Sequence, residues 1–539
     1  GGTMLQGIVT QKQEWLYLDT SLGKLPDEIQ LHTARNGKEG VQILLETVGE
    51  IANVKATLPT MMDAEIYQLI DIPVEYNTAS ATDQGGRFVI MDEQADKPFY
   101  CTRKAPFRVY DCLKPIHTSE VQVRNNRFGL YVCIVPQEEI IEGSYPVTLE
   151  IEIEEGTYTL VMNVQIYDVL IPTEQFSVTN WFSLNNIASK HGLKQGSQAF
   201  LDMVRAYARA MRRTRQTHFF LMLDPKYYRL ETEFNFDYIK PIAEIFFEEG
   251  FKKMEIGSFA TQGDYMLTDE LKCAADPTIK VSSKEGYWIL TEMIRAWKSF
   301  LEVNKWENKV VYHICDEPDV HITGPESMVQ RKAQYFMIAN LLRKYLGNLQ
   351  IIEAVKTDEF RGGIDIWVPL TVNYEELKDE FDKLKNQGNE VWNYVCCAPT
   401  GEYLNRFLDI PLLRSRLLFW GCSKYKLDGY LHWGLNHYGE GQDPFEQSCC
   451  PNPTGLGTSF PAGDAHIVYP GADGPWISMR LEAQRRGIED LELLNQMEAN
   501  DSVKYDELVS KIFTNNKVYE DNINLFEEVR EKMLRWASR

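Results

Sequence analysis

Between residues 173 and 500 the sequence alternates short apolar runs with longer amphipathic segments, and this alternation limits the possible folds most. The apolar runs are rich in β-branched and aromatic residues, which is typical of buried parallel strands. Eight strands are expected, at residues 176–181, 217–223, 253–257, 309–315, 349–353, 364–368, 390–395 and 429–433. Helices are expected at residues 197–213, 238–249, 284–303, 326–345, 374–386 and 410–425. The pattern predicts a (β/α)8 barrel of the TIM type.

The flanking segments have different patterns. Residues 1–172 contain short alternating strands without helices between them, and Glu154-Glu155-Gly156 separates the last two as a hairpin, which predicts an N-terminal β-sandwich. Residues 439–475 are rich in Gly and Pro and are expected to form a loop that covers the site at the barrel mouth. The chain is therefore predicted to be multidomain α/β: a sandwich over residues 1–172, the barrel over residues 173–500 and a C-terminal helical extension over residues 501–539.

The net charge and the cysteine pattern limit the binding partners and the cellular compartment that can be expected. A net charge of −22 argues against nucleic acid and anionic membranes as main partners, and no apolar run is long enough for membrane insertion. The ten cysteines include no CxxC pair, which favours a reduced, cytoplasmic protein. No signal peptide pattern is visible at the start of this chain. The sequence leaves open whether a natural leader before Met4 was removed and whether the protein is secreted.

Two adjacent carboxyl groups, Asp316 and Glu317, follow the fourth predicted strand. The active sites of (β/α)8 enzymes lie at the carboxyl ends of the strands, so the pair is expected in the catalytic mouth. Adjacent carboxylates repel each other, which favours one of them keeping its proton, as a general acid must. His313, on the same strand, is interpreted as a core histidine, with orientation of a carboxylate as the alternative. The remaining histidines form no helical zinc-binding pair, so neither a metal nor another cofactor is expected.

Aromatic residues recur at the ends of other predicted strands. They are Trp181 at the end of the first strand, Trp367 near the end of the sixth, Tyr394 at the end of the seventh and Trp433 at the end of the eighth, with Asn436 close behind. Aromatic rings stack on the C–H face of a sugar, and amides and carboxylates bind its hydroxyl groups. A sugar is therefore the expected ligand, although for each single aromatic residue a place in the barrel core is equally open.

Several motifs together resemble glycoside hydrolase family 123, whose members are exo-acting β-N-acetylgalactosaminidases. The resemblance covers roughly residues 172–494. It rests on Asp316-Glu317, residues 392–399 (WNYVCCAP), Asn405, Arg414, residues 429–436 (GYLHWGLN) and residues 479–490 (MRLEAQRRGIED). It implies retaining hydrolysis assisted by the substrate's own 2-acetamido group. It further implies that the Tyr394 phenol contacts the acetamido carbonyl and that Trp433 forms a wall of the acetamido pocket.

The spacing of the carboxyl groups is compatible with that mechanism. Retaining glycosidases that use an enzyme nucleophile hold two carboxyl groups on either side of the scissile bond, and sequence neighbours are poorly placed for this. We therefore expect the reaction to pass through an oxazoline intermediate, with Glu317 as general acid and base. Asp316 is expected to orient the acetamido group and to stabilise this intermediate. The expected partner is a glycolipid or glycoprotein glycan with terminal β-GalNAc. A β-N-acetylhexosaminidase with GlcNAc or mixed specificity, a non-catalytic glycan-binding barrel and the oligomeric state remain open.

Overall fold

The computed structural model of the chain describes residues 5–80, 88–231, 233–263, 270–452 and 459–538. The chain forms two compact units. The first, called the sandwich unit, comprises Gly1–Gln175, Thr400–Tyr425 and Tyr438–Arg539. The second, called the barrel unit, comprises Phe176–Pro399 and Lys426–His437. The domain boundaries expected after residues 172 and 500 remain predictions.

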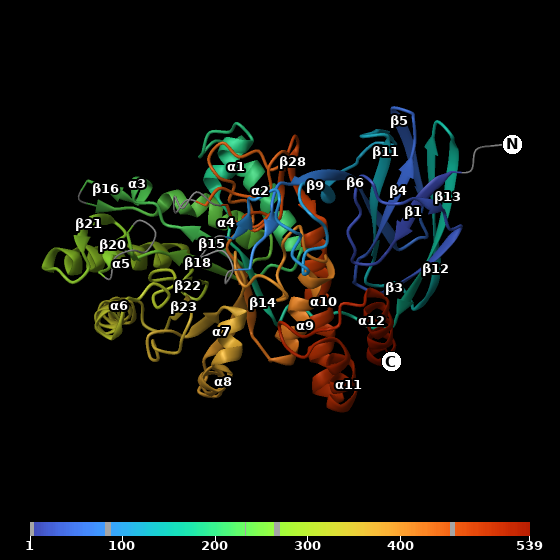
Figure 1. The fold of residues 1–539 in the computed structure, drawn as a ribbon. Helices are drawn as coiled ribbons and strands as arrows, with labels where there is room; N and C mark the ends of the chain where they lie inside the picture. The colour runs from blue at the N-terminus through green and yellow to red at the C-terminus, as the bar shows by residue number, and fades with distance from the viewer. Residues whose placement is uncertain (1–4, 81–87, 232, 264–269, 453–458, 539) are drawn as a thin grey trace. The chain divides into compact units, whose positions relative to one another are not determined.

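Two sheets of the sandwich unit share one hydrophobic core, and β7 (Asn77–Thr78) pairs with β8 (Val89–Ile90) in a separate two-stranded sheet. The first sheet has the order β2-β1-β4-β11-β6-β9-β28-β27 and the second the order β10-β5-β12-β13-β3. The core combines residues of both sheets, such as Ile43 and Val132 of the first and Leu149 and Val164 of the second. The strands are β1 (Gln6–Thr10), β2 (Gly23–Lys24), β3 (Glu28–Ala34), β4 (Glu39–Glu46), β5 (Ile51–Thr57), β6 (Met62–Val74), β9 (Phe107–Pro115), β10 (Glu120–Gln122), β11 (Arg127–Pro136), β12 (Gly143–Ile153), β13 (Gly156–Tyr167), β27 (Tyr469–Gly471) and β28 (Gly474–Ser478). The predicted β-sandwich is confirmed, and Figure 1 shows most of these strands as blue and teal arrows.

The end of the segment predicted as a loop belongs to the first sheet. Strand β28 runs antiparallel to β9, with Ile477 opposite Leu113 and Ser478 opposite Cys112, and β27 pairs with β28. The expectation of a continuous loop over residues 439–475 is therefore wrong for this part, because its backbone groups are paired in a sheet. Residues 453–458 of the segment lie outside the described residues.

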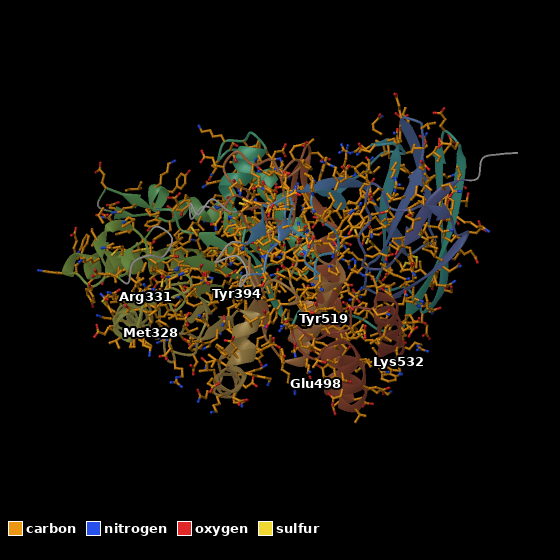
Figure 2. The ribbon with its side chains drawn as sticks, viewed as in Figure 1. Met328, Arg331, Tyr394, Glu498, Tyr519 and Lys532 are labelled. Carbon is orange, nitrogen blue, oxygen red and sulfur yellow. The ribbon has the colours of Figure 1, made fainter. Side chains whose placement is uncertain are left out.

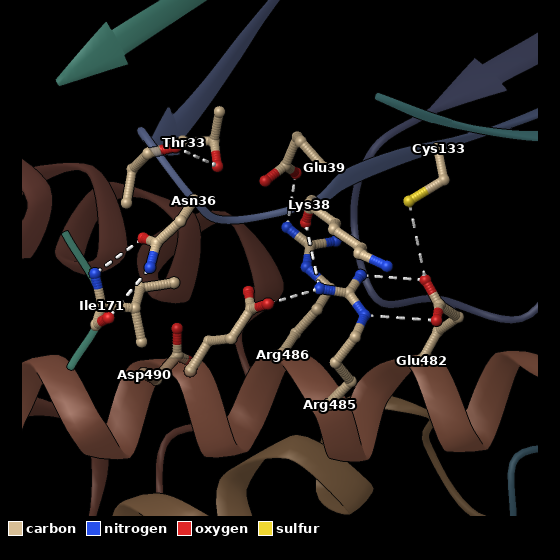
Figure 3. A network of polar contacts seen from close by, with 12 residues as sticks. Thr33, Asn36, Lys38, Glu39, Cys133, Ile171, Glu482, Arg485, Arg486 and Asp490 are labelled. Atoms are coloured by element: carbon tan, nitrogen blue, oxygen red, sulfur yellow. Dashed lines mark hydrogen bonds and ion pairs between the residues drawn. The ribbon is translucent and has the colours of Figure 1, made fainter. Parts of the chain in front are cut away.

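The charged helical motif at residues 479–490 forms buried ion pairs within the sandwich unit (Figure 3). It begins helix α10 (Met479–Asn500). Arg485 contacts Glu482 and Glu489 at 2.9 and 2.8 Å, and Arg486 contacts Glu39 at the start of β4. Buried charges need such partners, since an unpaired one is strongly destabilising. Loss of one partner would leave a buried charge unpaired in this unit, and the motif needs no role in chemistry to explain it.

Helices follow at the end of the chain, as predicted. They are α11 (Ser502–Ile512) and α12 (Ile523–Ala537). Within the sandwich unit α11 packs on α9 (Leu413–Lys424) and on α10, and α12 packs on α10, α11 and β3. The C-terminal helical extension is therefore confirmed.

The barrel unit contains eight parallel strands in the order β14-β26-β25-β24-β23-β22-β18-β15. They are β14 (Ser177–Asn180), β15 (His218–Met222), β18 (Lys253–Gly257), β22 (Val310–Tyr312), β23 (Gln350–Val355), β24 (Ile366–Pro369), β25 (Glu390–Tyr394) and β26 (Gly429–His432). The first and last strands of this order are linked at Val178 and Thr217, whose backbone N–H donates to the Val178 carbonyl at 3.0 Å. All eight strands overlap the predicted ranges, and the nearly closed TIM-like barrel is confirmed.

Helices in the barrel unit separate most of these strands along the chain (Figure 1). The longer ones begin with a serine cap where the sequence provides one: the hydroxyls of Ser197 and Ser283 accept the N–H of Phe200 and Gly286. The α-helices are α1 (Leu184–Lys190), α2 (Gln198–Arg213), α3 (Pro225–Tyr228), α4 (Lys240–Glu248), α5 (Lys284–Asn304), α6 (Pro325–Leu346), α7 (Thr371–Glu376) and α8 (Lys378–Asn386). Across the described part of the chain, no helix combines the length and apolarity needed to span a membrane.

Alternate residues of the barrel strands face opposite sides of the sheet. Ala354 of β23, Val368 of β24 and Tyr394 of β25 pack in one hydrophobic cluster, against which Trp181 also packs. Glu353 lies between the cluster members Ile352 and Ala354 and pairs in register with Trp367 of β24. Glu353 and Trp367 therefore belong to the other face of the sheet.

Candidate active site

Asp316 and Glu317 follow β22, and their backbone is held in a strained conformation. Glu317 has a φ of 46°, a left-handed conformation that costs free energy for a residue with a side chain. The amide of Gln262 donates to the carbonyl oxygens of Asp316 and Glu317 at 2.5 and 3.2 Å. Arg331 of α6, labelled in Figure 2, donates to Gln262 Oε1 at 2.8 Å and to the Pro318 carbonyl at 3.0 Å. These fully or nearly buried side chains fix the direction of the pair.

Glu317 accepts a hydrogen bond from the Tyr394 hydroxyl at 2.9 Å. Tyr394, also labelled in Figure 2, is the last residue of β25, so the contact joins the ends of the fourth and seventh barrel strands. Burial raises the pKa of Glu317, the Tyr394 hydrogen bond opposes this rise, and the charge of Asp319 adds to it. A carboxyl group with a raised pKa is suited to donate a proton near neutral pH.

Asp316 is reached by solvent although protein surrounds it. The residue has an exposed surface. Protein atoms packed around its carboxyl group nevertheless raise the pKa of this group well above the usual range, and the charge of Glu317 raises it further. Two negative charges this close together repel, so ionisation of one carboxyl group favours retention of the proton on the other. One neutral acid and one carboxylate side by side can supply a proton donor and a negative charge together.

Asp319 anchors the loop that follows β23. Its carboxyl oxygens accept the backbone N–H of Lys356 at 2.9 Å and both the N–H and the hydroxyl of Thr357 at 2.8 Å. Burial raises the pKa of this carboxyl group. Because three donors of the loop converge on its carboxyl group, Asp319 is placed to shape the loop. Asp316, in contrast, keeps an exposed surface.

Trp181 is bound to a buried carboxylate of the barrel. Its indole N–H donates to Glu255 Oε1 at 3.2 Å, and its ring packs on Phe220 with centroids 4.7 Å apart. Glu255 also accepts from the Thr179 hydroxyl and lies 2.9 Å from His313 Nε2. His313 is buried, as predicted for a core histidine, and it also contacts a carboxylate, which was the alternative. These contacts fix the Trp181 ring on the same side of the sheet as Tyr394.

Trp433 and Asn436 lie in the segment after β26. The half-buried Trp433 ring packs against the rings of His432 and His437, with centroids 6.4 and 5.5 Å away. Burial lowers the pKa of His437 to about 4, so this ring is neutral near pH 7. Fully buried Asn436 accepts the backbone N–H of Ser183 at 2.7 Å and donates to the Ser183 carbonyl at 3.1 Å. Its amide connects two loops, so the structure does not support the predicted sugar contact.

Trp367 is placed away from Glu317 and Tyr394. Its side chain is fully buried, its ring packs on Phe381 of α8, and its indole N–H lies 3.3 Å from Asn389 Oδ1, before the start of β25. The predicted role of Trp367 in substrate binding is not supported, because the residue faces the helical side of the sheet. The predicted roles of Trp181, Tyr394 and Trp433 stay predictions.

Sequence reasoning missed the buried polar residues that support the pair: Gln262, Arg331, Asp319, Glu255 and Glu353. Glu255 and Glu353 had a visible signal, since each is a lone acid inside an apolar strand. Gln262 and Arg331 had none, because their importance depends on contacts between distant loops. In the parts of the chain that the structure describes, no group of three or more His, Cys, Asp or Glu residues is arranged to hold a metal ion.

The family model for the catalytic domain of glycoside hydrolase 123 matches residues 173–497, more than half of the chain. The chain belongs to glycoside hydrolase family 123. A family 123 glycoside hydrolase from Clostridium perfringens, analysed for glycolipid glycan hydrolysis, is similar along 99% of this chain and 97% of its own, with a TM-score of 0.73 and 13% identity. At that identity the likeness shows the fold. Comparison with curated proteins gave no match.

Other solved structures are similar to this chain over shorter parts of its length. An endo-β-1,4-mannanase from Thermotoga petrophila aligns with 60% of this chain and 77% of its own, with a TM-score of 0.38 and 11% identity. A GH10 xylanase from termite gut aligns with 67% of this chain and 90% of its own, with a TM-score of 0.33 and 8% identity. Membership of family 123 makes the protein a glycoside hydrolase. Asp316-Glu317 at the end of the fourth barrel strand is its candidate catalytic pair.

The hydrogen bond from Tyr394 predicts a shift in pH dependence. Tyr394→Phe removes a donor that favours ionised Glu317, so the pKa of Glu317 should rise. Activity that needs protonated Glu317 should then persist to higher pH, which moves the alkaline limb of kcat/KM upward. Tyr374→Phe is the matched control, since the Tyr374 hydroxyl donates to Asp382 at 2.7 Å in the same unit. An alkaline limb at the wild-type position in Tyr394→Phe would contradict this coupling.

Proposed function

We propose that the protein is an exo-acting, retaining β-N-acetylgalactosaminidase that releases terminal β-linked GalNAc through an oxazoline intermediate. The proposal is carried by the adjacency of Asp316 and Glu317, together with the Tyr394 hydroxyl bound to Glu317 at 2.9 Å. Two neighbouring carboxyl groups at one strand end suit a reaction in which a single enzyme acid serves the leaving group. The nucleophile then comes from the substrate.

The first step breaks the glycosidic bond. The carbonyl oxygen of the 2-acetamido group attacks the anomeric carbon, and the bond to the leaving oxygen breaks as Glu317 gives that oxygen its proton. Asp316 accepts a hydrogen bond from the acetamido N–H, which directs the carbonyl oxygen to the anomeric carbon. Its negative charge also stabilises the positive charge that develops on the oxazolinium ring.

The second step restores the enzyme. Ionised Glu317 takes a proton from water as the water oxygen attacks the anomeric carbon from the face that the leaving group vacated. The carbon–oxygen bond of the oxazoline ring breaks, and the acetamido group is regenerated. Two inversions at one carbon give overall retention, so the product is β-GalNAc.

The family resemblance assigns the Tyr394 phenol to the acetamido carbonyl and the Trp433 ring to a wall of the acetamido pocket. In the free protein the same phenol donates to Glu317, so bound substrate has to compete for this hydrogen bond. Trp181, held by Glu255, is proposed to stack on the sugar. The proposed substrates are glycolipid or glycoprotein glycans, and the relative from Clostridium perfringens is described in terms of glycolipid glycan hydrolysis.

The assignment of the sugar is tested with aryl β-GalNAc and aryl β-GlcNAc glycosides that share one leaving group. We expect cleavage of the GalNAc compound and little of the GlcNAc compound. Cleavage of both at similar rates would instead indicate a β-N-acetylhexosaminidase of mixed specificity. Cleavage of neither, by folded protein, would indicate a non-catalytic glycan-binding barrel.

A further inference from the structure

Glu353 is a buried carboxyl group beside the catalytic pair that the proposed mechanism does not use. It lies on β23, where this strand separates from β22: the two strands pair only at Val311 with Gln350 and at Tyr312 with Ile351. Beyond that point Glu353 Oε1 accepts the backbone N–H of Ile314 at 2.5 Å. The side chain thus replaces a missing ladder partner two residues before Asp316.

The surroundings of Glu353 disfavour a charge. The residue is fully buried, and in the described structure its second oxygen, Oε2, has no hydrogen-bond partner. An ionised carboxylate with a buried, unpaired oxygen is costly. Burial raises the pKa of Glu353 well above the usual range, and the charge of Asp316 raises it further. Hydrogen bonds from the backbone N–H groups of Ile314 and Cys315 oppose this rise without cancelling it.

The other ionisable groups around Glu353 come from two directions. From β22 and the residues that follow it, Glu353 is faced by His313 (with Nδ1 4.0 Å from Oε1), Cys315, Asp316 and Asp319. From α6 it is faced by Tyr335. The positive charge of Arg331, on the same helix, acts to lower the pKa of Cys315. Burial raises the pKa of both Cys315 and Tyr335, so these two groups stay neutral. On β24, its register partner is the uncharged Trp367.

We propose that Glu353 is a positioning residue for the catalytic pair: its carboxyl group fixes the end of β22 and stays uncharged, so that the negative charge next to the substrate is carried by Asp316. A second negative charge at Glu353 would oppose ionisation of Asp316. The functional part of this inference rests on the proposed role of Asp316 as a carboxylate. The charge state of Glu353 itself does not depend on that role.

The charge state is tested with Glu353→Gln, which keeps an oxygen acceptor for Ile314. At neutral pH, the infrared spectrum of the wild type should contain the stretching band of a neutral carboxyl group that Glu353→Gln lacks. The acidic limb of kcat/KM should stay in place, because no negative charge has been removed. Absence of the band, together with an acidic limb moved to lower pH, would show that Glu353 is ionised and would overturn the proposal.

The positioning role is tested with Glu353→Met, which keeps the length of the side chain but leaves the Ile314 N–H without its acceptor. We expect kcat per folded molecule to fall by up to about 100-fold, with a smaller change in KM, since a small displacement of catalytic groups can cost that much. Unchanged kcat in folded Glu353→Met would refute this role. If Glu353→Met does not fold, the infrared and pH measurements on Glu353→Gln decide the proposal.

Glu390→Gln provides a matched control. Glu390 is a part-buried carboxyl group at the start of β25, bound to Gln350 at 3.1 Å, and burial raises its pKa as well. Its replacement should leave kcat and both limbs of the pH profile unchanged. The infrared arm needs no substrate, so its result is separate from failure of the GalNAc proposal, which would appear as wild-type protein unable to cleave aryl β-GalNAc.

Discussion

Glu317→Gln is expected to lower the turnover of β-GalNAc glycosides with poor leaving groups by about 100- to 10,000-fold, the usual contribution of general acid catalysis. Glutamine has nearly the same shape and can still accept the Tyr394 hydroxyl, which lies 2.9 Å from Glu317 in the wild type. It has no proton to give, so the loss should shrink as the leaving group becomes more acidic. The measurement is kcat for a series of aryl glycosides, with sugar binding measured separately.

Two controls define this result. Sugar binding and thermal unfolding of Glu317→Gln should remain close to those of the wild type, because the contacts of Gln262 and Arg331 with the backbone do not involve the Glu317 side chain. An equal loss on good and poor leaving groups would remove Glu317 from the role of general acid.

Asp316→Asn is expected to lower turnover on the order of 100- to 1000-fold, as removal of one preorganised electrostatic group typically does. Asparagine can still face the acetamido group, but it carries no negative charge to stabilise the oxazolinium ring. The loss should be similar for good and poor leaving groups, because Asp316 acts on the acetamido group. A leaving-group dependence as steep as that expected for Glu317→Gln would instead assign the proton transfer to Asp316.

The barrel could be predicted from the sequence because its strands are short, apolar and separated by amphipathic helices. Their carboxyl ends form one edge, so the place of Asp316 and Glu317 followed from counting strands. The contact between Glu317 and Tyr394 joins the fourth and seventh strands at that edge. The position was therefore predictable, whereas the hydrogen bond itself and its effect on the pKa of Glu317 required the structure.

The prediction for Trp367 was not supported because it considered only that Trp367 lies near a strand end. It did not consider which face of the sheet the side chain occupies. Ile366 and Val368 pack with Tyr394, so Trp367 between them faces the helices. That alternation could have been applied to the sequence. Asn436 is different, because its bonds to Ser183 join segments from opposite ends of the barrel sequence. The pairing of β28 with β9 is equally non-local, and no local pattern predicts it.

The central claim, that the substrate's acetamido group is the nucleophile, is tested most directly by one rate comparison in the wild type. An aryl β-GalNAc glycoside and the aryl β-galactoside with the same leaving group differ at the 2-position only. If Asp316 serves the acetamido group and no enzyme carboxylate attacks the anomeric carbon, the galactoside should hardly be cleaved. Cleavage of both compounds at about the same rate would contradict the mechanism, the role of Asp316 and the proposed substrate class together.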